Sequence, residues 1–239
     1  MKQLFFFVFI LLLVNSSCRM VDGKRVRGDG NITKENRRIQ PFTELEVSGA
    51  IEVRLSQDSA TSLVIETDDN LRPFISISQQ GDKLKIGSRS GYSLRPSHKI
   101  IVYISTNEFR KISIAGASSV TGKNKIGNGQ PLYFDLSGAS ELDMDVRAEK
   151  IELEAVGASK IDMRGEVKDL KIEASGASQI TCFNLLAENT DIRISGAGEA
   201  EVFASVKLNA RADGASSIRY KGDAEVTREV NGASSIKKE

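Results

Sequence analysis

The sequence predicts an all-β fold: a right-handed single-stranded β-helix, or β-solenoid, in which each coil spans about 18–22 positions and the first third is less regular. Three observations support this prediction. The motif Gly-Ala-Ser recurs along the chain, alternating apolar and polar residues flank its copies, and no window keeps the 3.6-residue apolar period of an amphipathic helix. A repeat of this length, extended at about 3.3 Å per residue, suits one solenoid coil and is too short for a propeller blade.

The repeated glycines are expected to form the corners of the coils, because a sharply bent strand favours a residue without a Cβ. From Gly116 onward, their sequence numbers rise in steps of 22, 19, 19, 20, 18 and 18. Serine hydroxyls of stacked corners are expected to hydrogen-bond along a file. The alternative is a flat ladder of small polar groups that serves as a binding face. The corner glycines are Gly49, Gly116, Gly138, Gly157, Gly176, Gly196, Gly214 and Gly232.

Apolar residues occupy fixed offsets from the corners, at two and four residues before the glycine and at four and six residues after it. We therefore expect Leu142, Ile161 and Ile180, each four residues after its glycine, to stack inside the coils. Cys182 falls at an inward offset and is expected to be a small core residue and not a nucleophile. Arg228 occupies an offset that is otherwise apolar.

Residues 1–17 are interpreted as a lipoprotein-type signal peptide. The apolar run from Leu4 to Val14 would be about 16 Å long as a helix, too short to cross a hydrocarbon core of about 30 Å. The small residues before Cys18 predict that this cysteine is lipidated; an ordinary signal peptide that leaves a stray thiol is the alternative. Residues 18–27 are then a linker. Arg19 favours an exported outer-membrane lipoprotein that faces the periplasm or the cell surface.

Residues 28–110 are expected to form a β-rich N-terminal region, and residues 111–239 the regular β-helix. Gly49 keeps the corner pattern, and its distance along the chain from Gly116 predicts three coils of about 22 positions each in this interval. A separate small β domain over residues 28–110 is the alternative. We also expect a hairpin turn at residues 80–82 and polar insertions at residues 87–99 and 121–131.

Three motifs carry a family resemblance: GDGN at residues 28–31, IETDDNLRPFI at residues 65–75, and the Gly-Ala-Ser series. In this order, they resemble a family of bacterial envelope proteins described as putative auto-transporter adhesins with a head GIN domain. The resemblance covers the chain from residue 28 to the end. It implies a secreted, lipid-anchored, right-handed β-helical protein, and it carries no catalytic residue over to this chain.

The composition argues against several functions. Lys and Arg number 33 against 32 Asp and Glu, and both signs are interspersed along the strands, which argues against nucleic acid as a partner. His98 is the single histidine, so neither a histidine metal site nor a Ser-His-Asp arrangement is expected. The stretch from Gly28 to Gly30 lacks the strand and helix of a phosphate-binding loop. No cofactor, metal or catalytic residue is expected, and the protein is predicted not to be an enzyme.

Asp143, Asp145 and Asp162 form a candidate acidic cluster, because Asp143 and Asp162 share an outward offset in adjacent coils. The favoured interpretation is a solvated strand face that discourages edge pairing. The alternatives are Ca²⁺ binding by the stacked carboxylates, and a β-helical enzyme that uses this cluster to act on polysaccharide.

The sequence therefore favours a lipid-anchored, non-enzymatic, adhesin-like scaffold that presents a long face to a glycan or protein ligand. Contact with the membrane is expected through the lipid at Cys18. The last coil, after Gly232, is incomplete, so self-association through an open solenoid end is a further alternative. The charges of Lys237, Lys238 and Glu239 oppose it.

Overall fold

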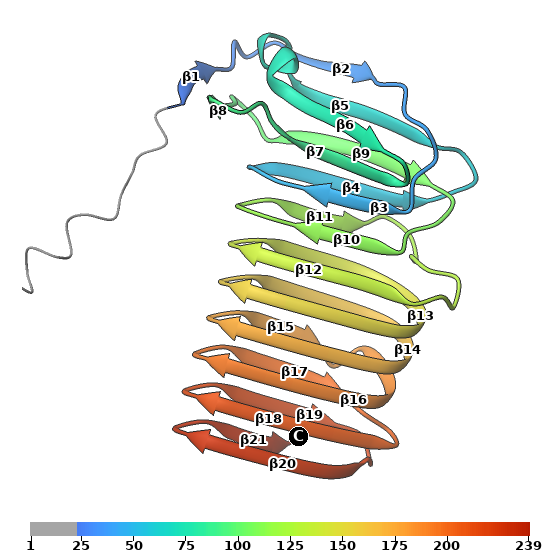
Figure 1. The fold of residues 1–239 in the computed structure, drawn as a ribbon, viewed down its shortest axis with the longest axis vertical. Helices are drawn as coiled ribbons and strands as arrows, with labels where there is room; N and C mark the ends of the chain where they lie inside the picture. Colours follow the sequence, from blue (N-terminus) through green and yellow to red (C-terminus); the bar gives the residue numbers. More distant parts are fainter. Residues whose placement is uncertain (1–22) are drawn as a thin grey trace, which may run out of the picture.

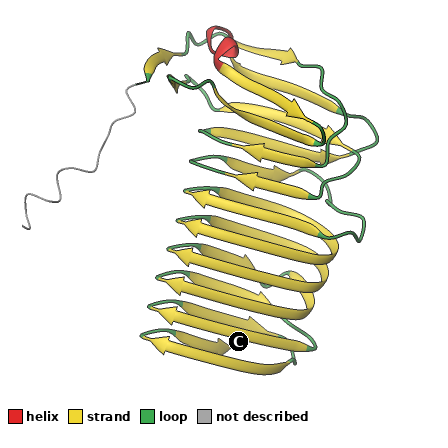
Figure 2. Ribbon diagram, viewed as in Figure 1, coloured by secondary structure: helices red, strands yellow, loops and turns green. Residues whose placement is uncertain are grey.

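The computed structural model describes residues 23–239, and the predicted signal peptide and Cys18 lie outside these residues. The described chain is a right-handed β-solenoid: in Figure 1 the nearer strands run to the left, the chain returns behind them, and successive coils descend. Nearly every element is a strand, and a short 3₁₀ helix, η1 (Asp69–Phe74), lies at the top (Figure 2). No helix among the described residues is long and apolar enough to cross a membrane. The predicted fold class is confirmed.

Each coil contributes one strand to each of two sheets, and neighbouring coils pair in parallel. We call the strands that lead into the corners the front sheet and the strands that leave them the back sheet. From top to bottom, the front sheet contains β7 (Lys83–Ser88), β3 (Glu44–Val47), β10 (Lys111–Ile114), β12 (Leu132–Gly138), residues 151–157 of β13 (Glu141–Gly157), residues 170–176 of β14 (Lys160–Gly176), residues 189–196 of β16 (Leu185–Gly196), β18 (Lys207–Gly214) and β20 (Glu225–Gly232). The back sheet contains β9 (Ile100–Thr106), β4 (Ile51–Gln57), β11 (Ser119–Gly122), residues 141–148 of β13, residues 160–167 of β14, β15 (Gln179–Cys182), β17 (Glu199–Phe203), β19 (Ser217–Lys221) and β21 (Ser235–Lys238).

The inward files predicted from the repeat are present. Leu142 pairs with Ile161, and Ile161 pairs with Ile180 in the next coil, and all three side chains are buried. Because equal offsets place similar side chains over one another, the coils share one hydrophobic core. This core extends from Phe42 to Ile236, so it includes both the regular coils and N-terminal strands.

Conformation and close approach both require glycine at the corners. At Gly157, φ is +113°, which L residues rarely adopt, and the other predicted corners also have positive φ. The N–H of Ala158 donates to the carbonyl of Gly138 in the preceding coil at 2.8 Å. A Cβ on Gly157 would lie 2.6 Å from that carbonyl oxygen. Glycine therefore lets the corners stack at hydrogen-bonding distance.

The corner serines do not form the expected file of Ser–Ser hydrogen bonds. Ser140 donates to the carbonyl of Ser137 at 2.7 Å, and Ser216 donates to that of Asp213 at 2.9 Å. Each of these carbonyls directly precedes the corner glycine, so the hydroxyl closes the turn of its own coil. Both serines are buried, which is also true of Ser118, Ser159 and Ser178. The alternative of an outward polar ladder is therefore wrong for these corners, where the serines face inward.

The prediction of three coils between Gly49 and Gly116 is wrong, because these two corners belong to adjacent coils. β3 pairs directly with β10, and a Cβ on Gly116 would lie 2.8 Å from the carbonyl oxygen of Gly49. The intervening chain turns back above β3 and β4, where β7 and β9 form the topmost coil. Strand alternation looks the same in a coil and in a returning segment, so the sequence pattern did not distinguish them.

Antiparallel strands cap the topmost coil. β6 (Ile75–Gln80) pairs with β7 through the predicted hairpin turn, and β5 (Ser62–Asp68) lies between β9 and β2 (Ile32–Asn36). β1 (Lys24–Arg27) and β8 (Tyr92–Arg95) form a separate two-stranded sheet beside them. The antiparallel strands cover the edges to which another coil would otherwise pair.

A buried carboxylate, Asp68, fastens this cap. It accepts hydrogen bonds from the N–H of Gly30 at 2.8 Å, from the N–H of Ser97 at 2.9 Å, and from the Ser97 hydroxyl at 2.6 Å. Burial raises the pKa of Asp68, but these hydrogen bonds together lower it more, so the net pKa lies below its ordinary value. A Cβ on Gly28 would overlap the same carboxylate. The GDGN and DDNL motifs of the sequence therefore contact each other and close the upper end.

The lower end of the solenoid carries cations at two inward offsets. Arg228 pairs in register with the buried Ala210, and Lys238 pairs with the buried Tyr220. The guanidinium of Arg228 donates to the Tyr220 hydroxyl at 2.6 Å, and Nζ of Lys238 lies 2.9 Å from Asp223. An apolar coil that stacked on the exposed edges of β20 and β21 would have to desolvate these two charges. This desolvation opposes stacking at the lower end.

Candidate functional site

The outer face of the front sheet is covered by polar side chains, many of which pair within or between coils. Lys85 Nζ lies 3.0 Å from Glu46, and Lys111 Nζ lies 2.7 Å from Asp135. Exposed ion pairs each contribute about 0–1 kcal/mol, so they affect the register and polarity of the face more than its stability. The charges of this face therefore largely neutralise one another. A side chain that lacks a close partner of opposite charge is a candidate for binding a ligand.

Two adjoining hollows lie on this face, over the lower coils. Their volumes are about 480 Å³ and 330 Å³, and Arg193 and Arg211 line both of them. The remaining side chains at their rims are mostly carboxylates, amides and hydroxyls. Those that are not buried are Asp191, Asn209, Thr227 and Glu229 in the larger hollow, and Glu154, Val156, Glu173, Ser175, Ser195 and Asp213 in the smaller one. The buried lining residues are Ile192 and Ala210 in the larger hollow, and Ala155, Ala174 and Ile194 in the smaller one.

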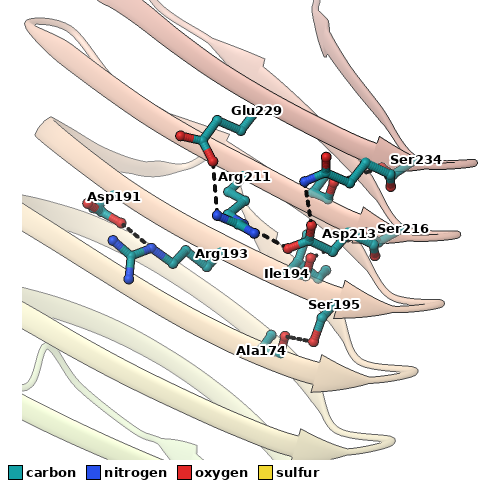
Figure 3. Close-up of polar contacts among 12 residues, drawn as sticks. Ala174, Asp191, Arg193, Ile194, Ser195, Arg211, Asp213, Ser216, Glu229 and Ser234 are labelled. Atoms are coloured by element: carbon teal, nitrogen blue, oxygen red, sulfur yellow. Dashed lines mark hydrogen bonds and ion pairs between the residues drawn. The ribbon is translucent and has the colours of Figure 1, made fainter.

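Arg211 is fixed by two carboxylates, as Figure 3 shows. Its Nε donates to Asp213 at 2.9 Å, and its Nη1 donates to Glu229 in the next coil at 3.0 Å. The amide of Asn231 also donates to Asp213, at 2.7 Å. Arg211 and, to a smaller extent, Asn231 lower the pKa of Asp213, so this carboxylate is ionised at neutral pH.

Arg193 is held much more loosely. Its ion pair to Asp191 uses Nε at 3.8 Å, and its side chain is 60% exposed (Figure 3). Arg193 is in register with Arg211 on one side and with Glu173 on the other. Lys171 bonds Glu173 at 2.9 Å and is the main cause of the lowered pKa of Glu173, with a smaller effect from Arg193. An exposed guanidinium beside an open polar hollow suits binding of an anionic ligand.

The predicted acidic residues lie together on the outer side of the back sheet, away from these hollows. Asp143 is opposite Asp162 in register, and Nη1 of Arg164 donates to Asp143 at 2.8 Å. Nζ of Lys125 lies 3.8 Å from Asp145. Within residues 23–239, no group of three or more His, Cys, Asp or Glu side chains has an arrangement that could hold a metal ion. Basic partners stand beside two of the three carboxylates.

Neither Cys182 nor His98 has the surroundings of a catalytic group. Cys182 is fully buried, and burial raises the pKa of its thiol to about 12. His98 is exposed, and its Nδ1 lies 3.2 Å from the Ser97 hydroxyl. That hydroxyl donates to Asp68, so the serine lies between the acid and the histidine. In a catalytic triad the histidine occupies the middle position.

Sequence reasoning missed Arg193 and Arg211, although a signal for their proximity was present. Each lies three residues before a corner glycine, Gly196 and Gly214 respectively. Equal offsets place them on the same face in adjacent coils. What the offsets do not give is the difference between one arginine with two carboxylate partners and another with a single distant one.

Comparison with known proteins agrees with this architecture. A model of the family described as "putative auto-transporter adhesin, head GIN domain" matches residues 41–224. The chain belongs to this family. The match confirms the family that the motifs implied. It begins after the GDGN motif and ends at residue 224, whereas the resemblance was expected to run from residue 28 to the end.

Solved structures share the fold of this family member at low sequence identity. A putative adhesin from Bacteroides fragilis is 19% identical with a TM-score of 0.80, and the alignment covers 90% of this chain and 100% of that one. A putative adhesin from Parabacteroides distasonis is 24% identical with a TM-score of 0.74 over the same shares. Another protein of that species, described as a putative lipid binding protein, is 23% identical with a TM-score of 0.70, again over the same shares. No curated protein matches the chain.

Proposed function

We propose that this protein is a non-enzymatic binding scaffold of the cell envelope, which holds the front sheet as a rigid, polar face toward a glycan ligand. The observation that carries the proposal is the pair of open polar hollows on a face whose side chains are stacked in register by the coils. Rigid strands fix the backbone positions from which these side chains project, which reduces the ordering cost of binding. The names of the adhesin structures agree with such a role.

The proposed binding mode is multivalent. Stacked coils repeat outward positions about every 4.8 Å, so a long polymer that lies along the solenoid meets similar side chains several times. Weak contacts that are linked in this way reach a high combined affinity. A protein ligand and the lipid suggested by the name of one structural neighbour are the other outcomes of a binding experiment.

The proposal places the protein on the outer membrane through a lipid at Cys18, which lies outside the described residues. It is supported by the apolar run and small residues that precede Cys18. A Cys18→Ser variant is expected to lose metabolic labelling with palmitate and to leave the membrane fraction. Protease treatment of intact cells then reports which side of the membrane the solenoid faces. Retention of label in the variant would contradict the anchor without affecting the scaffold.

Immobilised wild-type protein on glycan, protein and lipid arrays tests the scaffold. Binding to a glycan without release of reducing sugar is the expected result. Release of reducing sugar that depends on Asp143 or Asp162 would instead support the polysaccharide-acting enzyme. Failure to retain any glycan would overturn the glycan-binding scaffold. If a protein or a lipid were then retained, that class of molecule would be the ligand instead.

A further inference from the structure

Arg193 differs from the other paired cations of the front sheet. Its closest carboxylate contact is 3.8 Å, and its terminal nitrogens donate no hydrogen bond to any group within residues 23–239. In Figure 3 the single contact drawn for this guanidinium leads to Asp191. Distances of 2.7–3.3 Å characterise the ion pairs of the comparable cations Lys83, Lys85, Lys111, Lys171 and Arg211. Arg193 therefore keeps its two-pronged donor edge for another partner.

The neighbourhood of Arg193 limits what that partner can be. A guanidinium edge binds a carboxylate through two parallel hydrogen bonds. Glu173, Asp191 and Glu229 surround the arginines, so additional negative charges close to the bound carboxylate would be repelled. The chemistry therefore favours one isolated carboxylate with uncharged groups on both sides of it.

The flanking groups and the backbone favour a sugar over a peptide. Asn209 and Thr227 line the hollow on one side of Arg193, and Ser175 and Ser195 line the other, which suits ligand hydroxyl groups. The backbone groups of β16 are paired to β14 and β18, so this face offers no free strand edge to an extended peptide.

We propose that Arg193 and its two flanking hollows form a binding site for a uronic acid residue that lies between neutral sugars in an acidic polysaccharide. This proposal rests on the proposed function and specifies its ligand class. The carboxylate of the uronic acid bonds the terminal nitrogens of Arg193, and the neutral sugars occupy the hollows on either side. Arg211, whose bonds to Asp213 and Glu229 hold it in place, makes no direct bond to the ligand.

Calorimetric titration with hexasaccharides in which uronic acids alternate with neutral N-acetylated sugars tests this site. Wild-type protein is expected to bind at least one of them, and to bind its carboxyl-reduced form at least tenfold more weakly, since a charged hydrogen-bonded contact contributes about 1.5–3 kcal/mol. A hexamer with a carboxylate on every sugar is expected to bind less well than the alternating one.

Three variants make the test specific. Arg193→Gln is expected to weaken binding at least tenfold, and Arg193→Lys to restore only part of it, because a lysine keeps the charge and loses the fork. Arg219→Gln is the matched control: Arg219 is an exposed arginine on the back sheet, paired to Glu201 and Glu239, and its loss should leave binding unchanged. Circular dichroism confirms that each variant is folded.

The outcomes separate this inference from the proposed function. No binding of any alternating hexasaccharide, or equal binding by wild type and Arg193→Gln, would overturn the uronic acid site. Binding of neutral glycans that does not depend on Arg193 would overturn the site and leave the scaffold intact. Absence of all glycan binding would overturn both.

Discussion

Replacement of a corner glycine by alanine tests the stacking of the coils most directly. In Gly157→Ala the new Cβ would lie 2.6 Å from the carbonyl oxygen of Gly138, whereas ordinary contact begins at 3.4 Å. The corners must separate by about 0.8 Å, which stretches the 2.8 Å bond from the N–H of Ala158 to the same oxygen beyond hydrogen-bonding length. The crowding costs about 1–3 kcal/mol and the lost hydrogen bond about 1 kcal/mol.

Gly129→Ala is the matched control. Gly129 also has positive φ, +89°, but a Cβ there would meet nothing within 4 Å. Both variants share the backbone strain of about 1–3 kcal/mol, so their difference isolates the contact between coils. At about 2–4 °C for each kcal/mol, the Tm of Gly157→Ala is expected about 4–16 °C below that of Gly129→Ala by scanning calorimetry. Equal Tm values for the two variants would refute the argument for close approach at the corner.

Three further predictions concern the cap, the core and the lower end. Asp68→Asn is expected to lower Tm at pH 7 by about 3–12 °C, through loss of charged hydrogen bonds worth about 1.5–3 kcal/mol. Because folding lowers the pKa of Asp68, the ionised carboxylate contributes fully to the free energy of unfolding above its unfolded pKa of about 3.9. This contribution disappears as the pH falls through the folded pKa, so the difference in Tm between wild type and Asp68→Asn should narrow at acidic pH. A difference that stays constant with pH would contradict this. Cys182, whose thiol has a pKa of about 12, is expected to resist iodoacetamide at pH 8 in the folded protein and to react with it in urea. Rapid labelling of the native protein would show that the coil around Cys182 opens. The double variant Arg228→Val and Lys238→Val is expected to self-associate through the lower end, as measured by sedimentation velocity. The control Lys237→Val removes an exposed charge from β21, the strand of Lys238, and is expected to behave as wild type. A monomeric double variant would show that Arg228 and Lys238 do not oppose association.

The regular coils could be predicted from the sequence because a solenoid repeats its environment. Leu142 and Ile161 are equivalent by offset from their glycines, and the same offset makes them neighbours in space. The cap could not be predicted in this way. β5 and β6 show the alternation of ordinary coil strands, yet they are antiparallel, and Gly49 contacts Gly116 although the strands of the cap separate them in the sequence. Strand direction depends on where the chain turns back, which alternation does not record.

The candidate site shows a similar limit. The shared outward offset of Asp143 and Asp162 predicted the grouping of the acidic residues, and they do lie together on the back sheet. The same repeat places Arg164 on this outer face, where it donates to Asp143. Its positive charge neutralises part of the acidic group. The hollows beside Arg193 depend on side-chain lengths and on small differences between adjacent coils. Neither property is visible in the offsets.

The repeat that builds the fold also explains why a binding site would form where the pattern of charges changes. Directly stacked like charges are destabilising in a sheet, so Arg193 above Arg211 is unfavourable unless carboxylates compensate it. Asp213 and Glu229 compensate Arg211 at 2.9 and 3.0 Å, whereas Asp191 reaches Arg193 only at 3.8 Å. The remaining imbalance is what an incoming carboxylate would relieve, and local conflicts of this kind are expected at functional sites. On the proposal above, a ligand carboxylate would bond the exposed donor edge of Arg193 and offset its repulsion from Arg211.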